Sequence, residues 1–329
     1  MEKKAKGIGL LSGGLDSILA VKVLQEQGLD LIGVMFATPF FGPEPGGAEV
    51  CSMTGIPLRV LDIGAKHLEM LKKPLYGYGS QMNPCIDCHA LMLREAGHLM
   101  EEEGADFLFT GEVLGQRPMS QRRDSLRSVE KLSGYTGRVL RPLSARLLPP
   151  TIPETEGLID RERLLDINGR SRKRQMELVE RYALKSYPQP GGGCVLTKEG
   201  FVKKLKELLQ RYPRATSREL ESLKWGRHFR MPRGSICIIG RHRSDNQKLE
   251  ALSIDEDILL HVVHHPGPTA LILASPEAGE DLALAAGILA AYSDAPSGDL
   301  VSVRWRRGGE TGILGVKSTG KEQFKDCLI

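Results

Sequence analysis

The stretch that most constrains the fold is Ser12-Gly13-Gly14-Leu15-Asp16-Ser17, which lies between two apolar runs. The run over residues 7–11 is typical of a buried strand, and the run over residues 18–24 is typical of a helix packed against the same sheet. The stretch is therefore a tight turn from strand to helix. Two adjacent glycines let backbone N–H groups approach a ligand closely, and the positive end of the helix points at the same place. The turn predicts an anion-binding site.

The side chains of this turn favour a nucleotide that carries magnesium. The two serines are hydroxyl donors, whereas Asp16 repels a bare phosphate and can instead hold Mg²⁺. The turn resembles the signature of the PP-loop ATP pyrophosphatases, which transfer AMP to an oxygen and release pyrophosphate. The resemblance implies ATP as cofactor, Mg²⁺ on Asp16, and a nucleotide site made of Ser12, Gly13, Gly14, Asp16 and Ser17.

Length and composition bound the remaining possibilities. A chain of 329 residues favours two domains, and a formal net charge of +4 permits a nucleic-acid partner without requiring one. The start of the chain lacks the features of a secretory signal, and no apolar run is long enough to span a bilayer. We therefore expect a cytoplasmic protein with no membrane partner, whose six cysteines are thiols or metal ligands rather than disulfides.

Alternating strands and helices predict the fold of the first half. Residues 29–36, 58–62 and 106–110 are expected to form further buried strands, with a helix near 48–54, so the fold class is α/β with a doubly wound parallel sheet. Ligands of such sheets bind at the carboxyl ends of the strands. Met35 and Phe36 close the second strand and are placed to flank an adenine ring, although ordinary core packing explains them equally well.

Three cysteines form the second candidate site. Cys85 and Cys88 are two residues apart before a helix predicted over 90–101, and Cys194 follows the glycine run 191–193. This arrangement resembles the Cys-x-x-Cys and distant third cysteine of several tRNA-thiolating PP-loop enzymes. The resemblance implies catalytic thiols that hold a [4Fe–4S] cluster with one open iron. A persulfide relay through the same cysteines, or a dithiol beside an unrelated cysteine, remains the alternative.

The segment after the fourth strand is similar to the matching segment of bacterial 4-thiouridine synthases. The likeness rests on Thr-Gly-Glu-x-Leu-Gly-Gln over residues 110–116, followed by Ser120-Gln121. It implies that Gly111 gives room to the nucleotide and that Glu112, Gln116 and Gln121 orient the uridine or Mg²⁺. A plain capped loop is the alternative. Arg141 is a candidate phosphate contact, and the arginine-rich run 161–174 faces either nucleic acid or solvent.

The last third of the chain predicts a smaller α+β domain. Short strands near 236–242, 257–263, 269–273, 301–305 and 312–316 accompany a helix over 280–292. The ordered motifs, from Ile239-Gly240-Arg241 to Tyr292-Ser293, resemble the RNA-binding domain of the NFACT proteins. The resemblance implies RNA contacts through Arg241, Asn246 and His261, with Arg304, Trp305 and the next two arginines adding charge and a stacking face.

Together these predictions give three segments and one function. The segments are a PP-loop domain over 1–197, a helical linker over 198–234 and an NFACT-like domain over 235–329. The function is ATP-dependent thiolation of a uridine, at C2 or C4, in tRNA or another structured RNA, with sulfur from a cysteine desulfurase or free sulfide. The alternatives are a PP-loop enzyme that thiolates or amidates a small molecule, and a non-catalytic RNA-binding factor.

Overall fold

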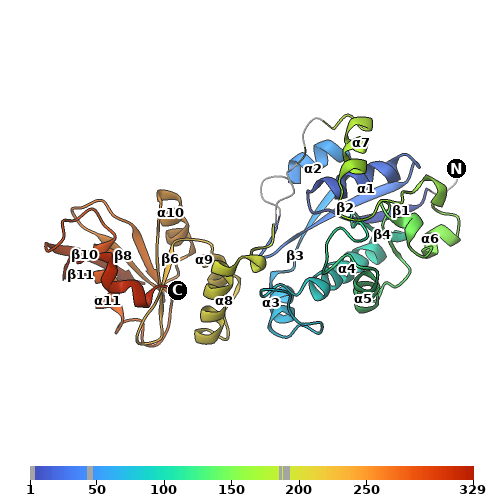
Figure 1. Ribbon diagram of the computed structural model, residues 1–329. Helices are drawn as coiled ribbons and strands as arrows, with labels where there is room; N and C mark the ends of the chain where they lie inside the picture. Colours follow the sequence, from blue (N-terminus) through green and yellow to red (C-terminus); the bar gives the residue numbers. More distant parts are fainter. Residues whose placement is uncertain (1–3, 43–46, 185–186, 188–192) are drawn as a thin grey trace. The chain divides into compact units, whose positions relative to one another are not determined.

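The computed structural model describes residues 4–42, 47–184, 187 and 193–329, without side chains for 47–49. The chain divides into two compact units, residues 1–197 and 198–329 (Figure 1). Each unit has its own sheet and its own hydrophobic core. None of the helices in the described ranges is both long and apolar enough to cross a membrane.

The first unit contains a five-stranded parallel sheet with the strand order β3-β2-β1-β4-β5. Its strands are β1 (Lys6–Leu10), β2 (Asp30–Ala37), β3 (Leu58–Asp62), β4 (Phe107–Thr110) and β5 (Val139–Leu140). Its α-helices are α1 (Leu15–Gln25), α2 (Gly47–Thr54), α3 (Gly64–Lys72), α4 (Cys85–Glu102), α5 (Arg123–Ser133), α6 (Ile152–Thr155) and α7 (Lys173–Arg181). Short 3₁₀ turns are η1 (Ala145–Leu147), η2 (Arg161–Arg163) and η3 (Val195–Thr197).

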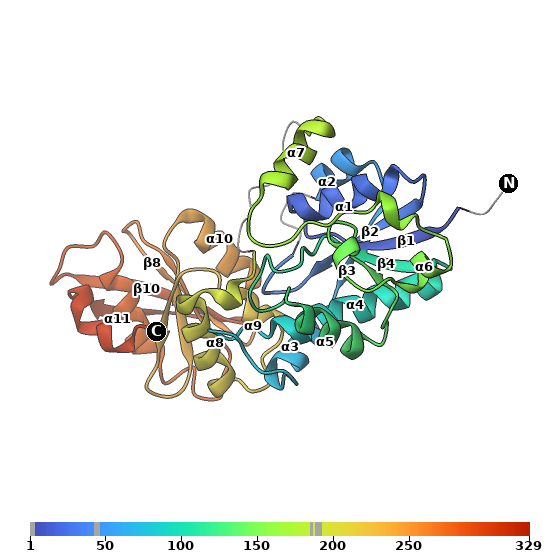
Figure 2. The ribbon, with the colours of Figure 1, turned by 45° about the vertical axis from the view of Figure 1, so that its right-hand side comes forward.

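Helices cover both faces of this sheet. One core cluster joins α1, α2 and α7 to the sheet, and a second joins α4 and α5 to the opposite face (Figures 1 and 2). Helices pack on both faces because the central strands carry apolar residues on both, as is typical of buried parallel strands. The predicted doubly wound α/β fold is confirmed.

The strand order reverses between β1 and β4, and the candidate site lies at this reversal. The chain moves from β1 to β2 and β3 on one side, then returns to add β4 and β5 on the other. Leu10 and Thr110 are register partners at the ends of β1 and β4, so the loops after both strands leave the sheet side by side. Such a switch point is where open α/β sheets bind their ligands.

The second unit is built on a six-stranded antiparallel sheet with the order β11-β10-β8-β9-β7-β6. Its strands are β6 (Arg227–Arg230), β7 (Ile236–Ile239), β8 (Ile258–Val262), β9 (Thr269–Ile272), β10 (Leu300–Arg307) and β11 (Glu310–Lys317). Its helices are α8 (Glu199–Arg211), α9 (Ser217–Ser222), α10 (Arg243–Leu252) and α11 (Leu282–Ala291), followed by the 3₁₀ turn η4 (Lys321–Cys327). The predicted second, smaller α+β domain is confirmed.

Strand β6 lies inside the segment 198–234, which the sequence predicts to be a helical linker. This segment does contain α8 and α9, but β6 then pairs with β7 as the edge strand of the second sheet. Phe229 is the reason, because it is fully buried in the core of that sheet and fixes the strand there. The strands of the second sheet therefore begin before residue 235.

Candidate functional site

The turn over residues 12–17, here called the nucleotide turn, joins β1 to α1 at the switch point. Gly13 has a φ of 77°, the left-handed conformation that favours glycine. Gly14 is the N-cap of α1 and provides no side-chain capping bond, so the first-turn N–H groups have no side-chain acceptor from it. Ser17 Oγ donates to Gly14 O at 2.7 Å, which directs this hydroxyl proton into the turn rather than toward a ligand. Ser12 is exposed.

Gly111 makes room for backbone rather than for a ligand. A Cβ atom at this position would lie 2.5 Å from Ser17 N and 2.6 Å from the carbonyl carbon of Asp16. The loop after β4 therefore touches the first turn of α1 only because residue 111 has no side chain. Gly111 is predicted from the sequence to give room to the nucleotide, whereas in the structure the first turn of α1 fills the space where its side chain would lie.

Asp16 is the centre of a polar network at the nucleotide turn. Its Oδ2 accepts hydrogen bonds from Gln116 Nε2 at 2.8 Å and from Arg172 Nη2 at 3.3 Å. Gln116 Oε1 in turn accepts from Gln175 Nε2 at 3.0 Å. Asp16 Oδ1 is buried and has no hydrogen-bond partner among the described residues. Because carboxylate oxygens are the ligands Mg²⁺ prefers, this free oxygen fits the predicted magnesium role of Asp16.

Two members of this network were missed as nucleotide-site residues. Arg172 belongs to the arginine-rich run 161–174, which the sequence analysis assigned to nucleic acid or solvent, and Gln175 was not singled out. They stand three residues apart at the start of α7, which is the spacing of one helix face. That spacing was the only local signal. Other members of the run are also paired, with Arg174 Nη1 at 2.6 Å from Asp166 Oδ1 and Arg161 bonded to Glu154.

Glu112 is buried two residues beyond β4 and carries a full charge. Arg141 Nε lies 3.1 Å from its Oε2, and His89 Nδ1 lies 2.9 Å from its Oε1. Burial would raise the pKa of Glu112, but the Arg141 charge and the hydrogen bond and charge of His89 outweigh burial and lower it to about 2. Arg141 also pairs with Glu130 and is itself buried, so two carboxylates hold its guanidinium, and a contact with phosphate stays a prediction.

The side chains of Met35 and Phe36 both lie in the core. Successive residues of a strand point to opposite faces. Met35 accordingly packs in the cluster with α1, and Phe36 in the cluster with α4; both are less than one-tenth exposed. Core packing, the alternative kept open by the sequence analysis, describes both side chains. Adenine recognition by the main chain here stays a prediction.

The three cysteine thiols of the second candidate site interact electrostatically. Cys85 and Cys88 lie in the first turn of α4, and Asn83 Nδ2 donates to Cys85 Sγ at 3.3 Å. Burial raises the pKa of Cys88, and the charges of Cys194 and Cys85 raise it further. The pKa of Cys194 is likewise raised, first by burial and then by Cys85. Glycines 191 and 192, part of the run before Cys194, lie outside the described residues.

Three cysteine thiols are the donor type of an iron–sulfur cluster. Within the described ranges, no three His, Cys, Asp or Glu side chains are grouped so that they could hold one metal ion. The thiolates of an iron–sulfur cubane bind different irons, so they do not have to meet at one point. Three thiols whose ionised forms repel one another would also be stabilised by a cationic iron site.

A contact chain connects the cysteines to the nucleotide turn. His89 follows Cys88 in α4 and bonds to Glu112, and Gly111 beside Glu112 packs on the backbone of Asp16. From the sequence, His89 is a weak candidate ligand beside the two cysteines and more typical of a solvated or capping residue, whereas the structure pairs it with Glu112. Val195, next to Cys194, donates its N–H to Phe40 O at 3.1 Å, which fixes Cys194 near the carboxyl end of β2. Both candidate sites therefore share the same edge of the sheet.

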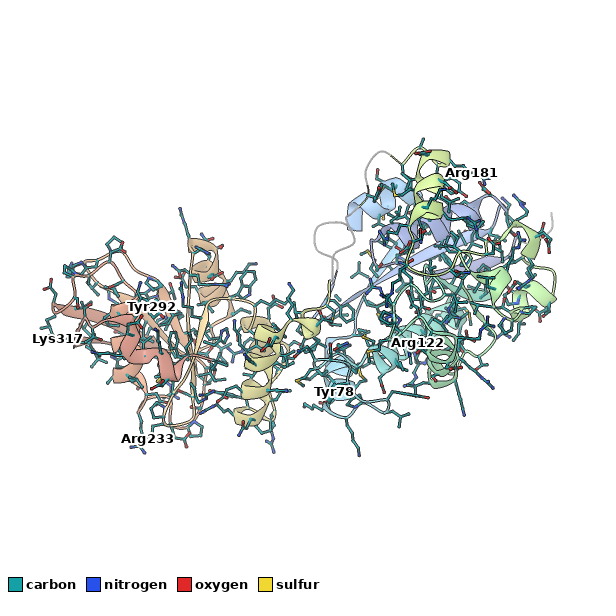
Figure 3. The ribbon with its side chains drawn as sticks, in the orientation of Figure 1. Tyr78, Arg122, Arg181, Arg233, Tyr292 and Lys317 are labelled. Carbon is teal, nitrogen blue, oxygen red and sulfur yellow. The ribbon has the colours of Figure 1, made fainter. Side chains whose placement is uncertain are left out.

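The second unit presents a separate cationic face. Arg304 is the register partner of both His261 on β8 and Ile313 on β11, and residues 302 and 306 share its face of β10. The opposite face carries Val301 and Val303, which pack under α11. We call His261, Arg304, Arg306 and Lys317 the cationic face; Figure 3 labels Lys317, which lies at the edge of this sheet.

The cationic face is open and its arginines are unneutralised. Arg304 and Arg306 are exposed and form no ion pair with any residue in the described part of the chain. Ile313 beside them is 62 % exposed. Burial lowers the pKa of His261, Glu250 opposes that shift, and Arg304 and Arg306 lower the pKa further. These electrostatic interactions indicate that the two guanidinium groups lie near the His261 ring.

The other predicted RNA contacts are not all on this face. Trp305 packs on the α11 side of β10, above Gly312, because adjacent strand residues alternate between faces. The grouping of Arg304 and Trp305 as one charged stacking surface is therefore wrong. Arg241 is exposed but pairs with Asp245 at 2.8 Å. Asn246 Oδ1 accepts from Thr269 N at 3.1 Å and so fastens α10 to β9.

Comparisons with known families divide the chain in the same way. Residues 3–146 match the family model described as thiamine biosynthesis protein (ThiI). Residues 226–327 match the family model described as the NFACT protein RNA binding domain. The resemblances inferred from the sequence, to a PP-loop thiouridine synthase and to the NFACT RNA-binding domain, are confirmed.

Curated relatives are similar to the first unit. The tRNA-specific 2-thiouridylase MnmA of Trichlorobacter lovleyi is 34% identical over 113 residues, which make up 31% of this chain and 31% of that protein. MnmA of Agrobacterium fabrum is 29% identical over 125 residues, 33% of this chain and 31% of that protein. The chain thus spans about a third of the length of these relatives.

Two solved structures show more distant likeness. A 4-thiouridine synthetase in complex with RNA and ATP has 23% identity and a TM-score of 0.38, over 66% of this chain and 53% of that chain. The C-terminal part of the fibronectin/fibrinogen-binding protein of Streptococcus suis has 14% identity and a TM-score of 0.27, over 80% of this chain and 94% of that chain.

Proposed function

We propose that the chain uses ATP to thiolate a uridine in tRNA or another structured RNA. The observation that carries this proposal is the contact chain from Cys88 and His89, through Glu112 and Gly111, to Asp16. It supports a thiol site and a nucleotide site at one sheet edge. The match to ThiI and the thiouridylase relatives support thiolation, and the match to the NFACT domain supports RNA as the substrate.

The first chemical step is adenylation. The uridine carbonyl oxygen attacks the α-phosphorus of ATP, an oxygen–phosphorus bond forms, and the bond to the pyrophosphate oxygen breaks. The N–H groups of the nucleotide turn and the N-terminus of α1 bind the phosphates. Asp16 Oδ1 would hold Mg²⁺, and Gln116 orients the same carboxylate through Oδ2. Magnesium bound there would neutralise the charge on the departing pyrophosphate.

The second step replaces oxygen with sulfur. A hydrosulfide or a persulfide attacks the activated carbon, the carbon–oxygen bond breaks, and AMP leaves with the former carbonyl oxygen. Adenylation is needed because AMP is a far better leaving group than a carbonyl oxygen. A [4Fe–4S] cluster on Cys85, Cys88 and Cys194 would supply an open iron for hydrosulfide. Transfer from a cysteine persulfide instead leaves a disulfide between two of these residues, which a thiol reductant then reduces.

RNA binding is assigned to the cationic face of the second unit. Exposed arginines without carboxylate partners retain their full charge for phosphate oxygens, and guanidinium groups bind phosphate bidentately. The exposed Ile313 gives this face an apolar surface for an unpaired base. Arg241, whose charge Asp245 partly neutralises, contributes less.

The test of the proposed function is a reaction with defined components. The purified chain, ATP, Mg²⁺, sulfide and unmodified tRNA are incubated without oxygen, and the RNA is digested for nucleoside mass spectrometry. We expect a thiouridine, together with AMP and pyrophosphate in equal amounts. Asp16→Ala should lose pyrophosphate release while still binding RNA. Turnover of ATP without any RNA dependence would contradict the proposal and favour a small-molecule substrate.

The cofactor assignment has its own test. Iron and acid-labile sulfide are measured, with the visible spectrum, in anaerobically purified wild type and in the alanine variants of the three cysteines. Loss of iron in every variant would support a cluster on Cys85, Cys88 and Cys194. Protein that thiolates RNA without iron would instead support the persulfide relay.

A further inference from the structure

Arg172 occupies the place of a cation at the nucleotide turn. Its Nη2 lies 3.3 Å from Asp16 Oδ2, although 156 residues separate the two in sequence. Gln175, one turn further along α7 and fully buried, holds Gln116, which holds the same Asp16 oxygen. α7 lies against α1 in both ribbon views and shares its core cluster (Figures 1 and 2). Two contacts therefore hold α7 at the nucleotide turn. The charged one is between Arg172 and Asp16, and the uncharged one runs from Gln175 through Gln116 to Asp16.

The charged contact leaves Asp16 incompletely satisfied. Arg172 and Gln116 both bond to Oδ2, whereas Oδ1 is buried without a partner. An ionised carboxylate with one buried, unpaired oxygen is a costly state that a second ligand relieves. A divalent cation on Oδ1 would supply that ligand and would repel the neighbouring guanidinium.

Arg172 has the means to move. About one-third of its side chain is exposed, whereas the Gln175 side chain is fully buried. A rotamer change of Arg172 therefore leaves α7 attached to the turn through Gln175 and Gln116. The unsatisfied N–H groups of α1 begin beside Asp16, so an anion bound on them lies next to the guanidinium as well.

We propose that Arg172 exchanges partners on nucleotide binding: it pairs with Asp16 in the free chain and with the phosphates of ATP once Mg²⁺ occupies Asp16. This inference rests on the proposed function, since it needs ATP at the nucleotide turn. Arginine suits the exchange, because its planar guanidinium binds carboxylate and phosphate in the same bidentate manner and stays charged throughout.

Titration calorimetry with ATP or adenosine, in the presence of Mg²⁺, tests the exchange. Arg172→Ala should weaken ATP binding several-fold and leave adenosine binding unchanged, because the bidentate bond to phosphate that it removes from the complex is stronger than the single 3.3 Å contact with Asp16 that it removes from the free chain. Arg174→Ala is the matched control, because Arg174 lies in the same helix and pairs with Asp166 on the surface. This control should bind both ligands as the wild type does.

A double-mutant cycle gives a second readout that does not depend on turnover. Melting temperatures are measured for the wild type, Asp16→Asn, Arg172→Ala and the double variant, with and without Mg²⁺–ATP. Coupling between the two residues is expected in the free chain, whereas Mg²⁺–ATP should raise the melting temperature of the wild type and not that of the two variants that carry Asp16→Asn. Unchanged or tighter ATP binding by Arg172→Ala would overturn the exchange while the wild type still binds ATP. Wild-type protein that binds no ATP would overturn the proposed function itself, and the exchange with it.

Discussion

Glu112 Oε1 lies 2.9 Å from His89 Nδ1. His89 directly follows Cys88, the second cysteine of the Cys-x-x-Cys pair. The same carboxylate accepts from Arg141 Nε through its other oxygen, at 3.1 Å. Glu112 therefore fixes the cysteine-bearing helix α4 to the loop that contacts the nucleotide turn. A displacement of this one carboxylate would alter the spacing between the two candidate sites.

Replacing Glu112 with Gln should destabilise the first unit. The change leaves the buried Arg141 with only Glu130 as a charged partner, and breaking a buried pair costs roughly 3–5 kcal/mol. Urea unfolding measures this loss. Glu26→Gln is the control, because Glu26 pairs with Arg181 on the surface, where a pair contributes less than about 1 kcal/mol. Equal effects of the two substitutions would contradict the structural role of Glu112.

Alanine at Gly111 should reduce ATP binding more than it reduces stability. A Cβ there clashes with the backbone of Asp16 and Ser17, which cannot move aside as a flexible side chain does. The first turn of α1 must shift, and its N–H groups shift with it. We expect at least a tenfold weaker ATP affinity by calorimetry, the effect of about 1.4 kcal/mol. Gly200→Ala, where a Cβ meets nothing within 4 Å, should bind ATP normally.

The sequence revealed those parts of the fold that depend on local pattern. The strand over 58–62 was predicted to its ends, and the nucleotide turn was recognised because all its residues are consecutive. Helices α5 and α7 were not predicted, since each buries only a few apolar side chains and is otherwise polar. β6 was missed for a similar reason, because two of its four residues are arginines.

The site residues that escaped prediction are joined across long distances in the chain. Arg172 reaches Asp16 from 156 residues away, Gln175 reaches Gln116 from 59 residues away, and no local pattern encodes either approach. Trp305 was misplaced for the opposite reason. Its neighbours Arg304 and Arg306 suggested a shared surface, but the two-residue period of β10 turns the indole toward the core.

Substitutions on the two faces of β10 should affect RNA affinity differently. Arg304→Ala and Arg306→Ala should each weaken binding and reduce the slope of log affinity against log salt concentration by about one, the signature of one phosphate contact. Trp305→Phe keeps an aromatic ring above Gly312 and should retain wild-type affinity. Filter binding at several salt concentrations measures both quantities. If the tryptophan variant lost as much affinity as the arginine variants, RNA would have to contact the other face.

The free energy of unfolding should decrease as the pH is lowered through the range in which His67 titrates. This residue is fully buried between Phe40 and Phe41, and burial lowers its pKa from 6.5 to about 4. The unfolded chain therefore binds a proton first as the pH decreases. Stability is complete above about pH 6.5 and declines toward pH 4, by roughly 3 kcal/mol for a shift of this size. In urea unfolding, His67→Phe should remove this part of the pH dependence; an unchanged profile would show that His67 is not its source.

Removing Cys194 should separate adenylation from sulfur transfer. Its thiol interacts with those of Cys85 and Cys88, but the nucleotide network around Asp16 includes no cysteine. Cys194→Ala should therefore release pyrophosphate as the adenylated RNA forms and keep AMP bound to that RNA, with no thiouridine detected by nucleoside mass spectrometry. Cys51→Ala is the control, since Cys51 lies in α2 and should leave both steps intact. Thiouridine formed by the Cys194 variant at the wild-type rate would remove this residue from the sulfur site and leave Cys85 and Cys88 to act as a dithiol.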